Sequence, residues 1–170
     1  MDILVLLLFL IPIYIANSAP VILGGGKALD LGTNFLDGRR ILGNGKTIRG
    51  FIGGVLAGTV FGGFVALAYQ LPFFTGPFEQ FIAAFIVSLG TMTGDSLGSF
   101  LKRRLNIESG KPFWPDTILF LIVALLFAFP FVNSALYQPF NVIFFLMLTI
   151  VMHPLTNALA NKFGLKKVPW

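Results

Sequence analysis

The chain has 170 residues, of which 56% are hydrophobic and 11% are charged, whereas a soluble domain usually carries about 25% charged residues. This composition predicts an integral membrane protein. The chain has no cysteine and one histidine, His153, which excludes disulfides, thiolate nucleophiles and metal sites built on cysteine or on several histidines. The net charge of +5 is typical of cytoplasmic Lys and Arg in a membrane protein, and without a soluble basic domain we expect no nucleic-acid binding.

The first apolar run covers residues 3–23, close to the roughly 20 residues that span a bilayer core. It lacks a basic start and is too long for the apolar part of a cleavable signal peptide, so we expect a retained span. Asn17 lies near its end. A transmembrane asparagine usually bonds to a neighbouring helix, but this one borders a polar loop, so an interhelical contact and a ligand contact both remain open.

The longest polar connection, residues 24–50, is rich in glycine and carries both basic and acidic side chains. A loop that only fixes membrane topology would explain the basic residues but not the interspersed Asp30, Asn34 and Asp37. The loop ends in Gly-Asn-Gly-Lys-Thr just before a predicted helix. A P-loop fold is rejected, because Arg40 stands where that motif needs glycine and no strand precedes it.

The physical device of a P-loop can still operate in this segment. Backbone amides at a helix N-terminus, together with a lysine such as Lys46, form a phosphate cradle on any fold. Thr47 follows directly and is a candidate for contact with the base, the ribose or a metal-bound water. The end of the loop is therefore a predicted phosphate-binding segment.

Four further apolar runs complete five predicted spans: 51–71, 79–101, 116–132 and 140–160. In the first of these, glycines at 54, 58 and 62 recur every four residues, which lets helices pack closely in lipid. In the last run Pro154 predicts a kink, and His153 and Asn157 lie one turn apart on one face. For this pair an interhelical hydrogen bond is favoured over substrate contact.

Charge is distributed unevenly along the chain. Loops 24–50 and 102–115 and the tail 161–170 hold all 12 Lys and Arg, and the other two turns hold none. By the positive-inside rule we expect the N-terminus outside and the C-terminus in the cytoplasm. The predicted fold class is an all-α polytopic membrane protein, a single transmembrane domain over residues 1–170, with five helices and a polar cavity facing the cytoplasm.

The stretch from residue 94 to residue 116 concentrates candidate ligands between two spans. Four of them fall at i, i+4, i+7 and i+8 and so share one helical face: Asp95, Ser99, Lys102 and Arg103. A polar turn with Lys111 follows, and Asp116 opens the next span. Carboxylates hold hard cations such as Mg²⁺ and Lys or Arg hold phosphates, so the pattern predicts chemistry on a phosphorylated substrate at the membrane surface.

This stretch resembles the signature of the phosphatidate cytidylyltransferases, GD-x-x-x-S-x-x-KR followed by a Lys and an Asp. Its positions here are Gly94, Asp95, Ser99, Lys102, Arg103, Lys111 and Asp116. The first loop, DGRRILGNGKTIRG, and the tail, HPLTNALANKFGLKKVPW, resemble the shorter archaeal branch, the CDP-archaeol synthases. The bacterial and eukaryotic pattern has a His-Gly-Gly segment and further acids near the last Asp, which this chain lacks. The metal site then has fewer protein ligands, or Asp37 completes it.

The resemblance implies a CTP-dependent cytidylyltransferase of phospholipid biosynthesis, which converts 2,3-bis-O-geranylgeranylglycerol 1-phosphate to CDP-archaeol and releases pyrophosphate. It implies a metal ion, Mg²⁺ or Mn²⁺, held by Asp95 and Asp116. The implied catalytic residues are Asp95, Asp116, Lys102, Arg103 and Lys111, and the nucleotide-binding candidates are Asn17, Asn34, Asp37, Lys46, Thr47, Arg49 and Ser99. The expected partners are CTP, the lipid phosphate and the bilayer, and the oligomeric state is left open, a homodimer included.

Two other classes of protein are weighed against this enzyme. A small membrane carrier or channel for an anionic solute would need polar groups along a path to both faces, and the far-side turns lack charge. A structural membrane subunit would have no acid inside a span. Asp95 could simply pair with Lys102 or Arg103, because a lone charge in a span costs about 2.5–3.5 kcal/mol, but such a pair does not explain Asp116.

Overall fold

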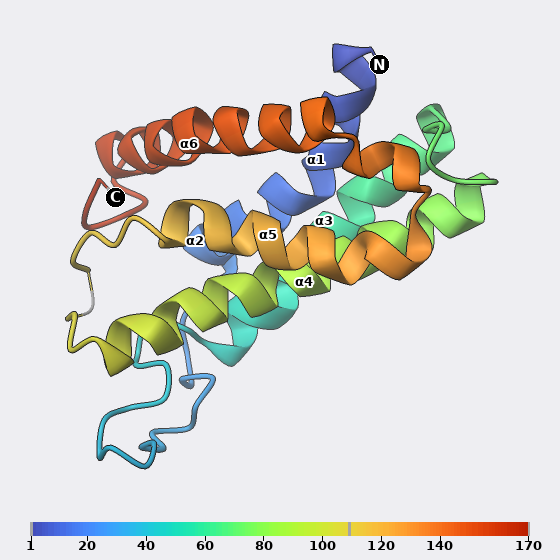
Figure 1. Cartoon of the computed structure of the whole chain (residues 1–170). Coiled ribbons are helices and arrows are strands. Elements are labelled where there is room, and N and C mark those ends of the chain that lie inside the picture. The colour runs from blue at the N-terminus through green and yellow to red at the C-terminus, as the bar shows by residue number, and fades with distance from the viewer. Residues whose placement is uncertain (1, 109, 170) are drawn as a thin grey trace.

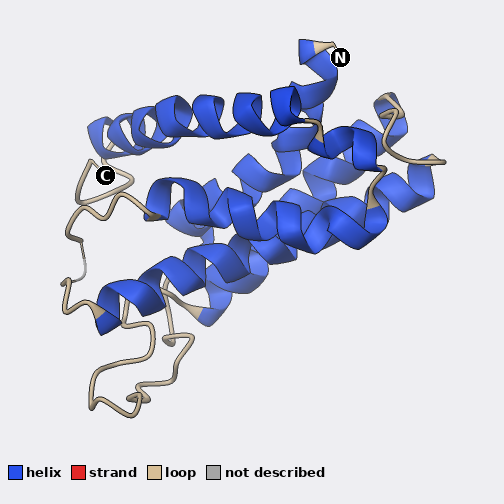
Figure 2. Ribbon diagram, viewed as in Figure 1, coloured by secondary structure: helices blue, strands red, loops and turns tan. Residues whose placement is uncertain are grey.

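The computed structural model describes residues 2–108 and 110–169, and within these ranges the chain forms six α-helices and two short 3₁₀ helices (Figures 1 and 2). The α-helices are α1 Ile3–Ser18, α2 Pro20–Leu23, α3 Ile48–Ala68, α4 Pro77–Arg104, α5 Asp116–Ala128 and α6 Pro139–Lys162. The 3₁₀ helices are η1 Phe129–Phe131 and η2 Ser134–Tyr137. These ranges contain no strand, only two isolated bridges that join Ala28 to Thr47 and Asn34 to Arg40.

The predicted all-α polytopic fold is confirmed. Four helical stretches are long and apolar enough to cross a membrane: Ile3–Leu23, Ile48–Ala68, Pro77–Arg104 and Pro139–Lys162. The remaining predicted span corresponds to the shorter apolar stretch Asp116–Phe131. The first span is divided into α1 and α2 at Pro20, which has no N–H to bond within α1.

Two helices extend beyond their predicted ends because polar residues join them. α3 begins at Ile48, since Oγ1 of Thr47 accepts a hydrogen bond from the amide of Gly50 and caps the helix. α4 runs on to Arg104, and its last turn carries three cationic side chains at the end where the helix dipole favours them. The signature residues predicted to share a face therefore lie on one continuous helix.

Glycines bring α1, α3, α4 and α5 into backbone contact. A side chain at Gly58 of α3 would collide with Ser88 of α4 and with the carbonyl oxygen of Pro12 of α1, as the glycine repeat of this span predicts. A second glycine repeat, on α4, packs against α5 and was not identified from the sequence. A Cβ at Gly94 would lie 2.7 Å from the Cα of Phe120. The relative placement of α4 and α5 is thus set by backbone contact.

α6 is packed more loosely than the other long helices. Only 11% of its most apolar stretch is buried, against 39–50% for the other three long spans. Near its start, Phe145 stacks on Phe9 of α1 at 5.7 Å between ring centroids, and the hydroxyls of Thr149 and Tyr14 share a hydrogen bond of 2.8 Å. Beyond this point α6 exposes apolar side chains such as Val151. One face of α6 is therefore available to lipid.

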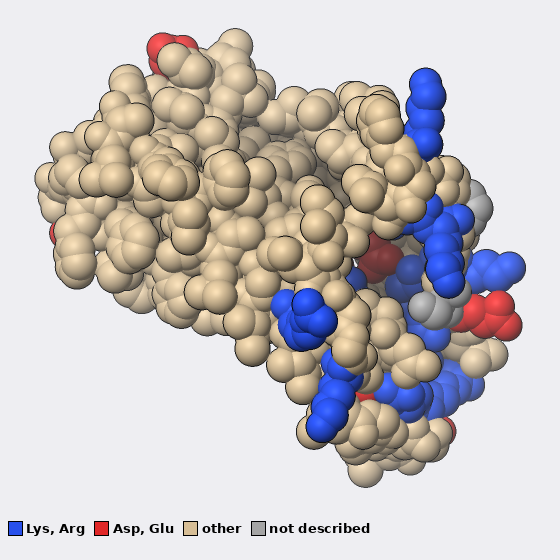
Figure 3. All heavy atoms as spheres, turned by 180° about the vertical axis from the view of Figure 1, so that it is seen from behind, with Lys and Arg blue, Asp and Glu red and all other residues tan. Residues whose placement is uncertain are grey.

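The Lys and Arg side chains of the molecule gather at one end. Figure 3 shows Lys and Arg around a hollow in which acidic atoms are visible. They come from the loop before α3, the end of α4 with the loop after it, and the C-terminal segment, which Figure 1 shows at the same end. The turns at the other end, residues 69–76 and 129–138, contain neither Lys nor Arg. The polar side chains are thus concentrated where one solvent compartment meets the spans.

Candidate active site

A cavity of about 480 Å³ lies at the charged end, bordered by α4, α5, α6, the first loop and the C-terminal tail. Seven of the predicted site residues line it: Lys46, Asp95, Ser99, Lys102, Arg103, Lys111 and Asp116. Three residues that were not predicted as ligands line it too: His153, Asn157 and Lys166. Five cationic and two carboxylate side chains border this one space, which suits a polyanionic ligand together with a cation.

Asp95 of α4 forms an ion pair with Lys46 of the first loop. The distance from Nζ to Oδ2 is 2.6 Å, and each side chain is about one quarter exposed, 24% for the lysine and 23% for the aspartate. The alternative in which Asp95 pairs with Lys102 or Arg103 of its own helix is wrong, because Lys102 binds a carboxylate of α5 instead. The acid within the third span is therefore neutralised by a residue 49 positions away in the sequence.

Asp116 is the first residue of α5, where the helix dipole favours a carboxylate. Its Oδ2 lies 3.0 Å from Nζ of Lys102, which also donates to the carbonyl oxygen of Lys111 at 2.8 Å. Gly98 of α4 permits this approach, because a Cβ there would lie 2.5 Å from Oδ1 of Asp116. Lys102 thus ties the second loop and α5 to α4.

Arg103 lies on α4 one helical turn after Ser99, and both residues line the cavity. Its Nε is buried and has no hydrogen-bond partner among residues 2–108 and 110–169, although the side chain borders the cavity. The loop passes close by, since a Cβ at Gly43 would lie 3.9 Å from this nitrogen. A buried guanidinium donor at the edge of a cavity is suited to a phosphate oxygen.

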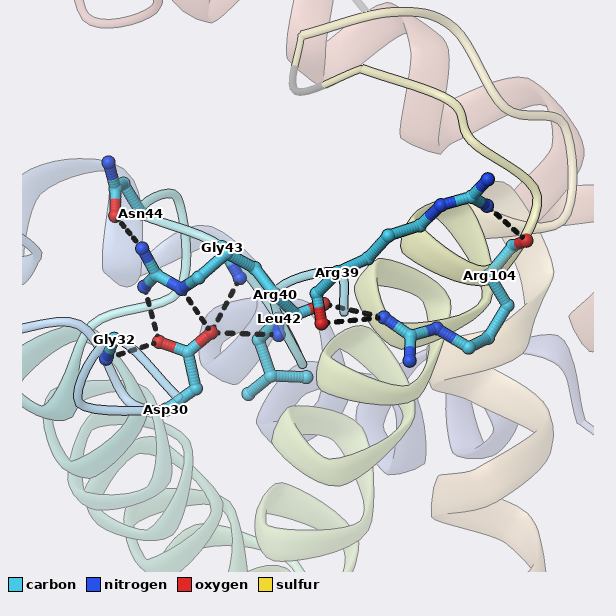
Figure 4. A network of polar contacts seen from close by, with 8 residues as sticks. All are labelled: Asp30, Gly32, Arg39, Arg40, Leu42, Gly43, Asn44 and Arg104. Carbon is cyan, nitrogen blue, oxygen red and sulfur yellow. Dashed lines mark hydrogen bonds and ion pairs between the residues drawn. The ribbon is translucent and has the colours of Figure 1, made fainter. Parts of the chain in front are cut away.

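Asp30 organises the first loop, although in the sequence it was only an unexplained acid. Its side chain is 0% exposed and binds the guanidinium of Arg40 through Nε, at 3.2 Å, and through Nη2 (Figure 4). The amides of Gly32, Leu42 and Gly43 donate to the same carboxylate at 3.1, 2.9 and 2.8 Å. Burial opposes ionisation, but these bonds outweigh it and hold the pKa of Asp30 well below its usual value.

The Asp30 network holds the segment that carries Lys46. Arg40 also donates to Oδ1 of Asn44 at 2.9 Å, so one guanidinium links two points of the loop. The backbone amide of Leu29 then bonds to the carbonyl oxygen of Lys46 at 2.7 Å. Lys46 is therefore held by its own backbone at the edge of the cavity, with its ammonium on Asp95.

Arg104, the last residue of α4, fastens the first loop to that helix (Figure 4). Its Nη1 lies 2.9 Å from Oδ1 of Asp37, and its Nη2 donates to the carbonyl oxygen of Arg40 at 2.7 Å. The guanidinium carbon lies 4.8 and 4.9 Å from the ring centroids of Phe35 and Phe100. Asp37 is thus engaged with the end of α4 and does not line the cavity, so this arrangement does not support Asp37 as a third metal ligand.

Not every predicted nucleotide contact reaches the cavity. The residues that do not line it are Asn17, Asn34, Asp37, Thr47 and Arg49. Thr47 caps α3 and borders a smaller space of about 90 Å³, which shares Lys46 and Asp95 with the main cavity. Asn34 and Arg49 are exposed. The roles of all five in nucleotide binding stay predictions.

The wall opposite α4 is formed by α6. His153 and Asn157 bond to each other within this helix, 3.3 Å between Nε2 and Nδ2, in place of the interhelical bond expected for them. The ring of His153 also packs on Phe120 of α5, at 5.4 Å between centroids. Oδ1 of Asn157 accepts a hydrogen bond from Nζ of Lys166 at 2.9 Å. In the sequence, this wall was indicated by two polar residues in an apolar run and by the tail motif that begins at His153.

Lys166 reaches the cavity because the tail turns back after α6. Gly164 has a φ of +72°, and the amide of Leu165 donates to the carbonyl oxygen of Ala160 at 2.8 Å, the bonding of a Schellman C-cap. Partial burial and the nearby Lys46 lower the pKa of Lys166. The tail thus adds a cation that belongs to the motif quoted for the tail but was not predicted as a ligand.

The carboxylates of the cavity are Asp95 and Asp116. No cluster of three or more His, Cys, Asp or Glu that could hold a metal ion occurs in the part of the chain that the structure describes. Two carboxylates nevertheless fit Mg²⁺, because this ion is usually bound through one or two of them and takes its other ligands from substrate phosphates and water. The donor set therefore suits an ion that is shared with a polyphosphate.

The similarity of this chain to known proteins extends over nearly its whole length. Residues 1–170 match the family described as CarS-like: CDP-archaeol synthase. The CDP-archaeol synthase of Pyrococcus horikoshii is 46% identical, over 95% of this chain and 94% of that protein, and the one of Methanocaldococcus jannaschii is 42% identical over the same shares. A solved structure of an intramembrane enzyme for archaeal membrane lipids biosynthesis is 33% identical, with a TM-score of 0.79, over 92% of this chain and 94% of that chain.

Proposed function

Because the chain belongs to the CarS-like family of CDP-archaeol synthases, we propose that it transfers the cytidylyl group of CTP to 2,3-bis-O-geranylgeranylglycerol 1-phosphate, an isoprenoid ether-lipid phosphate. The products are CDP-archaeol and pyrophosphate. The observation that carries this proposal is the cavity at the charged end of the spans, where two carboxylates lie among five cationic side chains. Such a site accepts a triphosphate with its metal ion next to the bilayer that holds the second substrate.

The reaction is a displacement at phosphorus. An oxygen of the lipid phosphate forms a bond to the α-phosphorus of CTP, and the bond from that phosphorus to the pyrophosphate oxygen breaks. The attacking oxygen is already anionic near neutral pH, so the site needs no strong general base. The chain contributes by positioning two anions and by neutralising charge on the leaving group. The residues we assign to phosphate binding are Lys46, Lys102, Arg103 and Lys111.

Asp95 and Asp116 would hold the metal ion, Mg²⁺ or Mn²⁺, by their carboxylate oxygens. When bound, the ion neutralises charge on the triphosphate and on the departing pyrophosphate. The same carboxylates are ion-paired with Lys46 and Lys102, at 2.6 and 3.0 Å. Each lysine therefore contacts a carboxylate and also lines the space in which a phosphate would bind. The ion pairs neutralise the two acids within the membrane protein.

The test is a product assay. The purified protein is incubated with CTP, Mg²⁺ and the lipid phosphate, and CDP-lipid and pyrophosphate are measured. We expect the two products in equal amounts, a preference for CTP over ATP and GTP, and no product in EDTA. A carrier for an anionic solute would release no pyrophosphate, and equal turnover of all the nucleotides would contradict the preference for CTP.

We also propose that the charged end faces the cytoplasm, with the N-terminus outside, because all 12 Lys and Arg lie at that end. The chain contains no cysteine, so a single introduced cysteine can be labelled alone. In intact cells or sealed vesicles, cysteines introduced by Thr75→Cys and Lys167→Cys should react with an impermeant reagent from opposite faces. Labelling of both from one face would contradict the proposed orientation.

A further inference from the structure

The proposed reaction brings together two anions that repel each other. A phosphate monoester carries about −1.5 to −2 charges at pH 7, and the triphosphate carries more. Cations that already neutralise the triphosphate cannot fully serve the second phosphate as well. The site therefore needs a cation group on the side from which the lipid phosphate attacks.

The cations of the cavity fall into two groups by origin. The first group comes from the first loop, α4 and the second loop: Lys46, Lys102, Arg103 and Lys111. Two of its members are bound to the carboxylates assigned to the metal ion. The second group is Lys166 alone, which comes from the tail and lies on the α6 wall. Its Nζ bonds to Oδ1 of Asn157 at 2.9 Å, and Asn157 bonds to His153 at 3.3 Å.

Of the two long spans that line the cavity, α4 and α6, the α6 wall leaves the larger share of its apolar stretch unburied. α6 is the long span with the smallest buried share, 11%, and it exposes apolar side chains along its whole length. Each buried CH₂ of a lipid tail contributes about 0.8 kcal/mol to membrane binding, so the tails stay in the bilayer while the phosphate reacts. A phosphate attached to such tails has to be bound at the wall of the cavity nearest to them.

The electrostatic surroundings of Lys166 also favour the binding of an anion there. Partial burial and the neighbouring Lys46 disfavour its ammonium form and lower its pKa. A cation in this setting gains more from an arriving anion than a cation in open water does, because the anion offsets both the lost hydration and the repulsion. The site is thus suited to a charged group that arrives and leaves during turnover.

We propose that Lys166, with Asn157 and His153, forms the subsite for the phosphate monoester of the lipid, opposite the α4 wall that binds the triphosphate. This inference rests on the proposed function. Lys166 is the residue that touches the phosphate. Asn157 is a positioning residue, because its Oδ1 holds the ammonium at the cavity, and His153 supports Asn157 from the preceding turn.

The closing experiment compares Lys166→Gln with Lys167→Gln, a neighbouring exposed lysine that does not line the cavity. Initial rates are measured at varied lipid phosphate with saturating CTP, and at varied CTP with saturating lipid phosphate. For Lys166→Gln we expect the KM for lipid phosphate to rise about tenfold to a hundredfold, and the KM for CTP to change less than about twofold. Lys166→Arg should recover most of this loss, and Asn157→Leu should shift the same KM by less.

A binding measurement separates this inference from the proposed function. Calorimetric titration with a detergent-solubilised dialkylglycerol phosphate, and separately with CTP and Mg²⁺, needs no turnover. Weaker binding of the lipid phosphate to Lys166→Gln, with CTP binding retained, supports the subsite. Unchanged lipid-phosphate binding, or equal losses for both ligands, overturns it. Failure of the wild-type protein to form CDP-lipid would overturn the proposed function. The binding titrations would then still test the subsite by themselves.

Discussion

The two walls of the cavity are built in opposite ways. The wall of α4 and α5 is joined through glycines, with the Cβ position of Gly94 only 2.7 Å from the Cα of Phe120. The wall of α6 has 11% of its apolar stretch buried and meets α1 mainly near its start. Backbone contact keeps Asp95 and Asp116 in a fixed relation, which the proposed metal ion would require. A loosely packed helix can shift as a lipid enters and a larger product leaves.

The largest effect should come from the carboxylates of the tightly packed wall. Asp95→Asn and Asp116→Asn each remove a charge that the proposed metal ion needs, and we expect cytidylyl transfer to fall at least about a hundredfold. The measurement is CDP-lipid formation over a range of Mg²⁺ concentrations. Glu108→Gln, which changes an exposed acid that does not line the cavity, is the matched control and should keep its activity. Full activity in both aspartate variants would remove these residues from the metal site.

The second effect concerns the packing in which the two walls differ, and it is expected in stability rather than in activity. Gly94→Leu forces a side chain against the backbone of Phe120 and Leu119, and overpacking of this kind costs about 3 kcal/mol at the upper end of its usual range. Ala158→Leu introduces the same side chain at an exposed position on α6 and should change stability by less than about 0.5 kcal/mol. Thermal unfolding in detergent compares them. Equal losses of stability would show that the two walls do not differ in packing.

The smallest of the three effects concerns the first loop, which holds Lys46 next to Asp95 of the tightly packed wall. Asp30→Asn removes a charged acceptor of several hydrogen bonds, and we expect it to weaken protection of the Leu42 and Gly43 amides by about 1.5–3 kcal/mol in hydrogen exchange. Because the pKa of Asp30 is lowered in the folded protein, its contribution is present above the unfolded value of about 3.9 and is lost as the pH falls below it.

The difference between wild type and Asp30→Asn should therefore be largest near neutral pH and shrink as the pH falls below about 4. Asp37→Asn is the matched control in the same loop, since that carboxylate is 37% exposed and pairs with Arg104 at the surface. A surface pair of this kind contributes about 0–1 kcal/mol. An effect of Asp30→Asn that did not depend on pH would mean that its charge does not organise the loop.

Local pattern was enough to predict the spans and the family. Hydropathy is a property of neighbouring residues, so the apolar runs gave the helices to within a few residues, and the all-α polytopic fold is confirmed. The signature from Gly94 to Asp116 and the motifs around it predicted the family, which the match over residues 1–170 confirms. Residues one or two helical turns apart, such as Asp95 and Ser99, necessarily share a face, so their joint place at the cavity was predictable.

Contacts between distant segments were decided by the tertiary structure. Lys46 rather than Lys102 neutralises Asp95, because the Asp30 network orders the first loop and Arg104 fastens that loop to α4. Lys166 joins the site because the C-cap after α6 turns the tail back. Helical periodicity shows which residues share a face but not which faces meet. Packing geometry and loop closure bring together residues 49 positions apart, and no pattern of neighbouring side chains encodes that distance.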